Sequence, residues 1–156
     1  MMNAVAGPDE ETFEALYRSQ WSSLTRLAWL LTGSREIAED VVHDAFLKVA
    51  PLLPTLQAPD QYVRRMVVNG SRDHHRRQRI IARHQPPPAE PLWGPEVDEV
   101  WELLVKLPQR QRHAIVLRYY SDLRIDDIAD LLACPAGTVK SLIHRGLEQM
   151  RKGLER

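Results

Sequence analysis

A helix predicted near the middle of the chain carries an unusual row of arginine side chains. Six residues spaced by three or four positions lie within about 80° of one another around such a helix. They are Arg65, Asn69, Arg72, Arg76, Arg79 and Arg83. Guanidinium groups this close repel one another unless a polyanion lies against them, and a merely solvated face would normally include acids. We therefore interpret this row, called the arginine ridge below, as a nucleic-acid-binding surface.

A second group of polar side chains surrounds one leucine on a helix predicted over residues 35–50. The 3.6-residue period places five apolar residues on the core side of this helix: Ala38, Val42, Ala45, Phe46 and Val49. The opposite side carries Glu36, Asp40, His43 and Asp44 together with Leu47. On the residues alone, two interpretations stay open: a solvated acidic face, or a docking surface for a basic helical partner.

Two predicted helices near the C-terminus are separated by a short break. The first covers residues 123–132, the break is residues 133–135, and the second runs from 136 to about 154. Two helices around such a turn, the second of them basic, describe a helix-turn-helix, whose second helix enters the DNA major groove. Its predicted outward residues are Ser141, His144, Arg145, Glu148 and Lys152, flanked by Thr138 and Lys140.

The composition predicts an all-α protein of two small helical domains. The chain has 156 residues and equal numbers of acidic and basic side chains, yet its charge is segregated: net −5 over 1–60, +6 over 61–85 and −5 over 86–105. Five of its eleven prolines fall within 86–95, a stretch that cannot be helical. We therefore predict domains at 9–84 and 96–155, joined by a proline-rich linker at 85–95. The other predicted helices cover 13–31, as one helix or two, 60–84, 97–107 and 108–120. Pro51 is expected to stop the helix over 35–50. The predicted buried stripe of the helix over 60–84 consists of Tyr62, Val63, Met66, Val67 and Gly70.

Several protein classes are disfavoured by the composition. No apolar run approaches the ~20 residues of a membrane span. The first eleven residues carry three acids and no base, which argues against a secretory signal. The single cysteine, Cys134, excludes an internal disulfide and a multi-thiolate zinc site. We expect a cytoplasmic protein that needs no metal and no cofactor.

Taken together, these motifs resemble the extracytoplasmic-function sigma factors of bacterial RNA polymerase, of actinobacterial type within the sigma-70 family. Residues 31–42 (LTGSREIAEDVV) are similar to the family's core-binding helix, and residues 62–69 (YVRRMVVN) to its −10-reading segment. Residues 107–112 (LPQRQR) and 116–120 (VLRYY) precede a segment, 137–141 (GTVKS), that is similar to the −35-reading helix. The two motif sets stand in the family's order on either side of the linker.

The resemblance implies that the first domain is sigma region 2 and the second is sigma region 4. It implies a non-enzymatic factor that binds core RNA polymerase and directs promoter-specific initiation, with an anti-sigma protein as a further candidate partner. Core polymerase would be bound by Glu36, Glu39, Asp40, His43, Asp44 and Leu47. Single-stranded −10 DNA would be bound by Arg65, Asn69, Arg72, Arg76, Arg77 and Arg79. Duplex −35 DNA would be bound by Thr138, Lys140, Ser141, His144 and Arg145.

Three positions depart from the family's pattern. His43 stands where glutamine is usual, and Leu142 stands where an arginine would contact phosphate. Ala133 occupies a turn position where glycine is frequent, at a cost of about 1 kcal/mol if that position needs a positive φ.

Two functions of other classes compete with this interpretation. A stand-alone helix-turn-helix repressor would need a dimer interface or a ligand pocket. A nucleic-acid enzyme would use Asp73, His74 and His75, but the sequence contains no P-loop, nucleophile constellation or paired carboxylates to support it.

Overall fold

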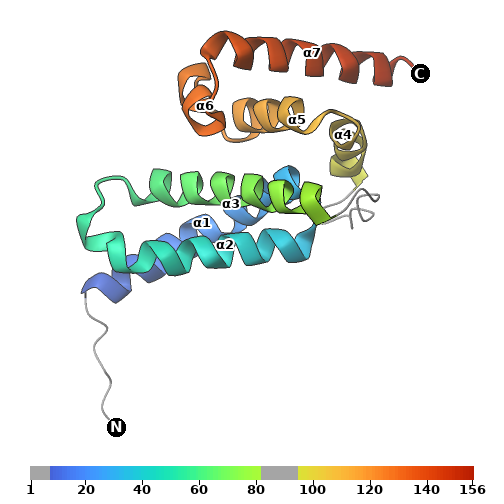
Figure 1. Ribbon diagram of the computed structural model, residues 1–156. Helices are drawn as coiled ribbons and strands as arrows, with labels where there is room; N and C mark the ends of the chain where they lie inside the picture. Colours follow the sequence, from blue (N-terminus) through green and yellow to red (C-terminus); the bar gives the residue numbers. More distant parts are fainter. Residues whose placement is uncertain (1–7, 82–94) are drawn as a thin grey trace. The chain divides into compact units, whose positions relative to one another are not determined.

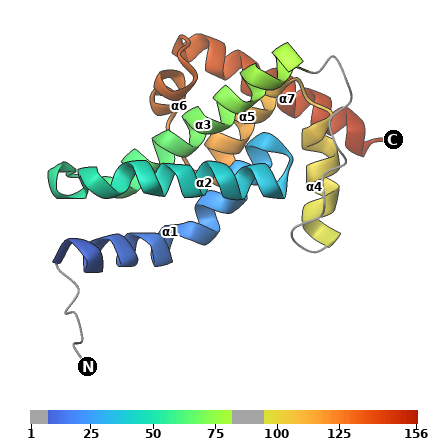
Figure 2. The same ribbon diagram turned by 60° about the horizontal axis from the view of Figure 1, so that its bottom comes forward.

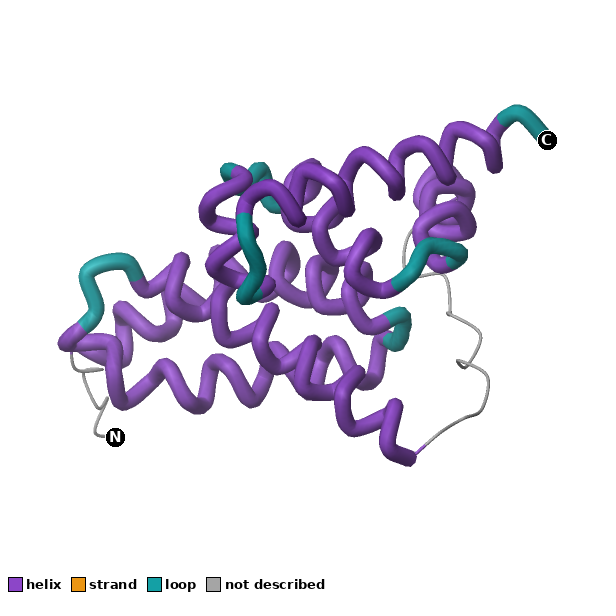
Figure 3. The backbone as a smooth tube through the Cα atoms, turned by 45° about the horizontal axis from the view of Figure 1, so that its top comes forward, coloured by secondary structure: helices purple, strands orange, loops and turns teal. Residues whose placement is uncertain are grey.

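The computed structural model of the chain consists of two compact units. It describes the backbone of residues 8–81 and 95–156, and the side chains of residues 12–74, 77 and 99–156. Unit 1 comprises Met1–Thr32 and Glu36–Arg83, and unit 2 comprises Gly33–Arg35 and His84–Arg156. Within the described residues every regular element is a helix and none is a strand (Figure 3). Arg83 and the predicted linker, except Pro95, lie outside the described residues.

Unit 1 is built from three long helices that lie side by side (Figure 1, Figure 2). They are α1 (Pro8–Thr32), α2 (Arg35–Val49) and α3 (Pro59–Ile81). The helix predicted over 13–31 is a single, longer helix. Helix α2 ends at Val49, as Pro51 predicts, and the chain continues as a 3₁₀ helix, η1 (Ala50–Thr55). The first turn of a helix tolerates proline, since its missing N–H would have no helical partner there.

The core of unit 1 confirms the predicted stripe of α2 and corrects that of α3. All five predicted core residues of α2 are buried. On α3, Val63 and Val67 are buried as predicted, but Tyr62 is 36% exposed, while Val68 and Ser71 are fully buried. The predicted stripe was wrong in phase because α3 packs against α1 as well as facing α2. The buried hydroxyl of Ser71 donates a hydrogen bond to the Val67 carbonyl (2.8 Å), which removes the cost of burying it.

Aromatic rings connect α1 to α2. Tyr17 stacks on Trp21 with ring centroids 5.0 Å apart, and the Phe46 ring lies 5.0 Å from that of Tyr17. Phe13 meets Phe46 edge to face at 6.1 Å. Such pairs contribute about 0.5–1.5 kcal/mol each beyond the area they bury. This cluster fixes α2, which carries the acidic face, against the first half of α1.

Unit 2 consists of α4 (Pro95–Val105), α5 (Gln109–Ile115), η2 (Val116–Tyr120), α6 (Ile125–Leu132) and α7 (Ala136–Leu154). Helix α5 lies along α7, and α6 packs near one end of this pair (Figure 1). The close approach of α5 and α7 requires Gly146, because a Cβ there would overlap the Ile115 side chain. Leu117, Ile128 and Val139 form the fully buried centre of the unit.

The predicted helices of unit 2 differ from the structure mainly at their ends. Helix α4 begins at Pro95 rather than 97, in keeping with the preference of proline for the first helical position. The helix predicted over 108–120 is α-helical only to Ile115 and then becomes the π-helix η2. Helix α6 begins two residues late, whereas α7 has the predicted bounds. No described helix combines the length and apolar character that crossing a membrane requires.

Candidate functional site

The outward side of α2 presents the predicted acidic face. Glu36, Asp40, His43 and Asp44 are exposed, and Leu47, at the C-terminal end of this face, is 60% exposed. Glu39 is half-buried beside them. Asp44 pairs with Lys48 at 2.8 Å, but this ion pair is exposed and contributes little to stability. The arrangement leaves an apolar side chain in water one turn beyond Asp44, at the C-terminal end of the row of acids, on a helix whose other side is fixed in the core.

Helix α3 presents the described part of the arginine ridge. Arg65 and Asn69 are exposed and Arg72 is half-buried. The side chains of Arg76 and Arg79 lie outside the described residues, so their place on the ridge stays a prediction. Arg77, which was grouped with them, lies about 120° from Arg65 around the helix and belongs to another side of α3.

That other side of α3 forms a groove with α2. The groove has a volume of about 460 Å³, and its apolar lining includes Val41, Met66 and Gly70. A Cβ on Gly70 would lie 3.1 Å from the Val41 side chain, so glycine permits this close crossing of the helices. The polar residues that line the groove are Asp40, Asp44, Lys48, Asn69, Asp73, His74 and Arg77. Residues predicted for polymerase docking and for DNA binding therefore line one groove.

His74 is the perturbed titratable group of this groove. Burial lowers its pKa, and the positive charge of Arg77 lowers it further. The imidazole is therefore neutral near pH 7. Asp73 lies beside it, whereas the His75 side chain is outside the described residues. Among the described residues, no three histidine, cysteine or acidic side chains are grouped so as to hold a metal ion.

Helix α7 exposes the predicted −35-reading side chains. Lys140, Ser141, His144 and Arg145 are exposed and Thr138 is half-buried. The Ser141 hydroxyl donates a hydrogen bond to the Gly137 carbonyl at 3.1 Å, so it faces outward as an acceptor. The outward face is held by the opposite side of the helix, where Val139, Ile143 and Gly146 are buried.

The turn between α6 and α7 adopts the left-handed conformation that glycine favours. Ala133 has φ 51° and ψ 49°. The amide of Cys134 donates to the Ala129 carbonyl (3.0 Å), and that of Ala133 donates to Asp130 (3.3 Å), which is the Schellman arrangement. The conditional expectation for Ala133 is therefore confirmed: an alanine occupies a backbone conformation that glycine adopts without strain.

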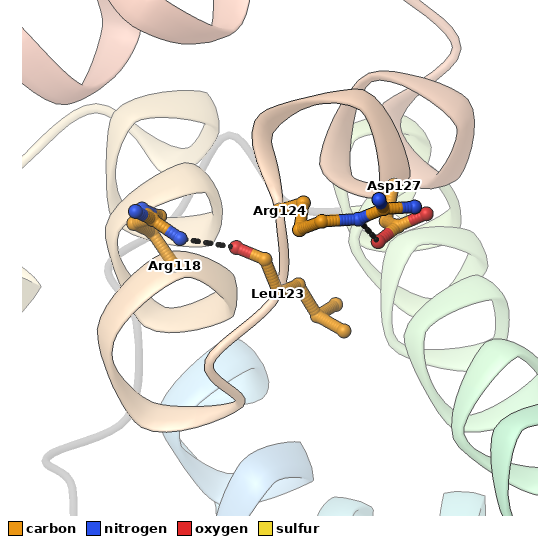
Figure 4. A network of polar contacts seen from close by, with 4 residues as sticks. All are labelled: Arg118, Leu123, Arg124 and Asp127. Atoms are coloured by element: carbon orange, nitrogen blue, oxygen red, sulfur yellow. Dashed lines mark hydrogen bonds and ion pairs between the residues drawn. The ribbon is translucent and has the colours of Figure 1, made fainter.

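A second polar arrangement, which no sequence motif indicates, lies in the loop that precedes α6 (Figure 4). Arg118 donates a hydrogen bond from Nη1 to the Leu123 carbonyl at 2.9 Å. Arg124 and Asp127 form an exposed ion pair at 3.3 Å. Asp122, between them in sequence, has φ 51°. A short polar stretch between two helices predicts a turn at Asp122, but no sequence pattern predicts the bond from Arg118.

Comparison with known proteins gives matches to both units. A model described as "Sigma-70 region 2" matches residues 16–80, and one described as "Sigma-70, region 4" matches residues 98–150. An "ECF RNA polymerase sigma factor SigM" of Mycobacterium tuberculosis is 31% identical, covering 95% of this chain and 79% of its own length. An "RNA polymerase sigma-E factor" of Streptomyces avermitilis is 27% identical, covering 92% of this chain and 85% of its own length.

Solved structures show the same fold. The sigma factor RpoE of Bartonella quintana, solved with the anti-sigma factor NepR, matches with a TM-score of 0.77 and 20% identity. This match covers 93% of the present chain and 98% of that one. CnrH, solved with the cytosolic domain of CnrY, matches with a TM-score of 0.67 and 22% identity, over 93% and 88% of the two chains.

Proposed function

The chain belongs to the sigma-70 family as an extracytoplasmic-function sigma factor, and from this premise we propose how its residues divide that work. A sigma factor binds core RNA polymerase and directs promoter-specific initiation of transcription. The observation that carries this function is the 31% identity to a relative across 95% of the chain, which spans both units. Members of the family regulate transcription rather than catalyse a reaction, and we propose the same non-enzymatic, cytoplasmic role here.

Core polymerase docks on the acidic face of α2. The proposal is supported by Leu47, which is 60% exposed among Glu36, Asp40 and Asp44. An exposed apolar residue at the end of a row of acids suits a basic helical surface, because the leucine is buried on docking while the acids attract the partner. Glu39 and His43 extend this surface. The groove continues it towards α3, where Asp73 adds a carboxylate that DNA phosphates would repel.

Single-stranded −10 DNA binds along the arginine ridge of α3. Arg65 and Arg72 supply positive charge, and Arg76 and Arg79 continue the same helical side in the sequence. Asn69 lies at the edge of the ridge nearest the groove and is exposed. Its amide can both donate to and accept from the edge of an unstacked base, so we assign it base reading and assign the arginines phosphate contacts.

Duplex −35 DNA binds the outward side of α7. Arg145 has the planar fork that bonds guanine at two positions, while Lys140 is a point charge suited to phosphate. Ser141, His144 and Thr138 complete this surface. We also propose that an anti-sigma protein regulates the factor by covering these surfaces. The similar sigma factor RpoE of Bartonella quintana was crystallised with the anti-sigma factor NepR, which supports this proposal.

Run-off transcription tests the assignment directly. The purified full chain is added to bacterial core RNA polymerase together with a promoter library randomised at the −10 and −35 elements, and the transcripts are sequenced. We expect transcripts from a small subset of promoters that share both elements. Specific duplex binding by the chain without polymerase, and no stimulated transcription, would favour the stand-alone repressor instead.

A further inference from the structure

Arg118 makes a hydrogen bond that none of the proposed binding surfaces uses. It lies half-buried in η2, and its Nη1 donates to the Leu123 carbonyl at 2.9 Å across the loop that leads into α6 (Figure 4). The guanidinium is planar and permanently charged. Its bond to a carbonyl is therefore strong and directional, and it fixes the orientation of the loop as well as its distance from η2.

The loop is held in one conformation by consecutive residues of η2. The amide of Leu123 donates to the Leu117 carbonyl at 3.2 Å, while the carbonyl of Leu123 accepts from Arg118. Both polar main-chain groups of one residue are thus bonded to the same helical turn. Asp122, which precedes it, has φ 51°, a conformation that costs energy in a non-glycine residue. A residue keeps a strained backbone conformation only where its surroundings hold it there. The two hydrogen bonds of Leu123 hold Asp122 in this way.

This loop sets where α6 begins. Arg124, the residue before α6, makes no side-chain capping bond, and its carbonyl accepts the first helical bond from Ile128 at 3.0 Å. Its ion pair with Asp127 is exposed and contributes little. The start of α6 is therefore fixed by the main chain at Leu123 and Arg124. Helix α6 is in turn joined to α7 by a three-residue turn and packs against it.

We propose that Arg118 is a positioning residue for −35 recognition. By holding the Leu123 carbonyl it fixes the entry into the helix-turn-helix, and so the angle at which α7 presents its outward face to duplex DNA. This inference rests on the proposed function of α7. It differs from a phosphate contact, because the bonded guanidinium nitrogen faces the protein's own main chain.

The test uses the full chain with core polymerase and a promoter library randomised only at the −35 element. Arg118→Met retains the apolar part of the side chain and removes the donor. We expect discrimination among −35 sequences to fall by about three- to tenfold, spread over all −35 positions, because a tilted helix loses every base contact partly. Arg118→Lys, which retains one charged donor, should recover much of the wild-type preference.

Arg110→Met is the matched control. Arg110 is exposed on α5 and makes no side-chain hydrogen bond or ion pair within the residues that the structure describes. The Arg110→Met variant should keep the wild-type discrimination among −35 sequences. If Arg118→Met does not fold, as judged by circular dichroism, Arg118→Gln takes its place, since the shorter neutral amide cannot supply the same charge-assisted bond.

Two measurements separate positioning from other roles. Amide hydrogen exchange of residues 123–128, measured without polymerase, should be about tenfold faster in Arg118→Met than in Arg110→Met. The salt dependence of promoter binding should stay unchanged; a decrease of about one unit in its slope would make Arg118 a phosphate contact and overturn the proposal. A wild-type chain without any −35 preference would overturn both the proposed function and this inference. Wild-type preference with an unchanged profile in Arg118→Met would overturn this inference alone.

Discussion

Asn69 lies at the boundary between two chemically different sides of α3. Arg65 and Arg72 extend one side with positive charge, while Asp73 on the other side lines the groove shared with α2. The amide is uncharged, so it neither repels phosphates nor competes with the arginines for them. It is exposed and makes no side-chain hydrogen bond within the described residues, which leaves its donor and acceptor available to a base.

Asn69→Ala should reduce open-complex formation at promoters that carry the preferred −10 base. We expect a loss of about 1–3 kcal/mol concentrated at one −10 position, because one amide reads one base. Run-off yields on single-base −10 variants measure it. Gln61→Ala, which removes an exposed amide near the start of α3, is the control and should change nothing. An equal loss at every −10 sequence would contradict base reading, and loss of polymerase binding would place Asn69 in the docking surface.

Substitutions of Arg145 and Lys140 should affect promoter recognition differently, although both residues are exposed cations on α7. Arg145→Ala should cost about 1–3 kcal/mol and relax discrimination at one −35 position. Lys140→Ala should weaken all promoters evenly and lower the salt slope of binding by about one unit, since a phosphate contact releases one counterion. Run-off yields on −35 variants at two salt concentrations separate these results. The same promoter ranking in both variants and wild type would remove base reading from Arg145.

At the scale of elements, two turns of unit 2 are closed by left-handed non-glycine residues, Asp122 and Ala133. Aspartate tolerates this conformation better than alanine does, because its short polar side chain can bond locally. Ala133 is therefore the more strained of the two. It lies in the turn of the helix-turn-helix, where the position of α7 is decided.

Ala133→Gly should stabilise the chain by about 0.5–1 kcal/mol, because glycine adopts the observed φ without a Cβ conflict. The gain is reduced by the greater freedom of glycine in the unfolded chain. Ala129→Gly is the matched control: it is the same substitution inside α6 and should destabilise by about 1 kcal/mol. Urea unfolding of the full-length variants measures both, and destabilisation by Ala133→Gly would show that the turn carries no strain.

The groove between α2 and α3 should make stability depend on pH through His74. Burial, and secondarily Arg77, lower its pKa in the folded chain, so below the ordinary value of about 6.5 the unfolded chain binds more protons. His74 therefore makes its full contribution to the free energy of unfolding above pH 6.5, and this contribution decreases as the pH is lowered below that value. His74→Gln should therefore lose less stability between pH 7.5 and 5.5 than wild type. His144→Gln, exposed on α7, is the control, and parallel losses in all three proteins would contradict the effect.

The parts of the fold that the sequence predicted are those that one helix determines by itself. The stripe of α2 follows from its period, since one side packs on the core and the other meets water. The stripe of α3 differs because α3 also packs against α1 and Val68 is fully buried, and single-helix periodicity contains no information about that neighbour. The shared groove and the Arg118 bond were not predicted for the same reason: each joins residues whose proximity arises only on packing.

At the scale of the whole molecule, a chain with no net charge has separate negative and positive segments, to which we assign a basic and an acidic partner. Residues 1–60 carry a net charge of −5 and residues 61–85 a net charge of +6, so the neutral total conceals both regions. The residues proposed to contact DNA occur in both units, one set assigned to single-stranded and the other to duplex promoter DNA. Their combined use requires core polymerase to hold the whole chain. A substitution that weakens docking should therefore lower transcription from every promoter by the same factor. Loss of a single DNA contact should not have this uniform effect.

Asp40→Arg and Leu47→Glu test this dependence. The first reverses a charge in the acidic face, and the second places a charge where an apolar side chain, 60% exposed in the free chain, would be buried against polymerase. Each should weaken co-elution with core polymerase about tenfold or more and lower run-off transcription from all promoters by the same factor, with their ranking unchanged.

Glu99→Arg makes the same charge reversal at an exposed position on α4 and should co-elute as wild type does. Unchanged co-elution of both α2 variants would exclude this face as the docking surface. A changed promoter ranking would show instead that α2 takes part in reading DNA, which the groove it shares with Asn69 would then explain.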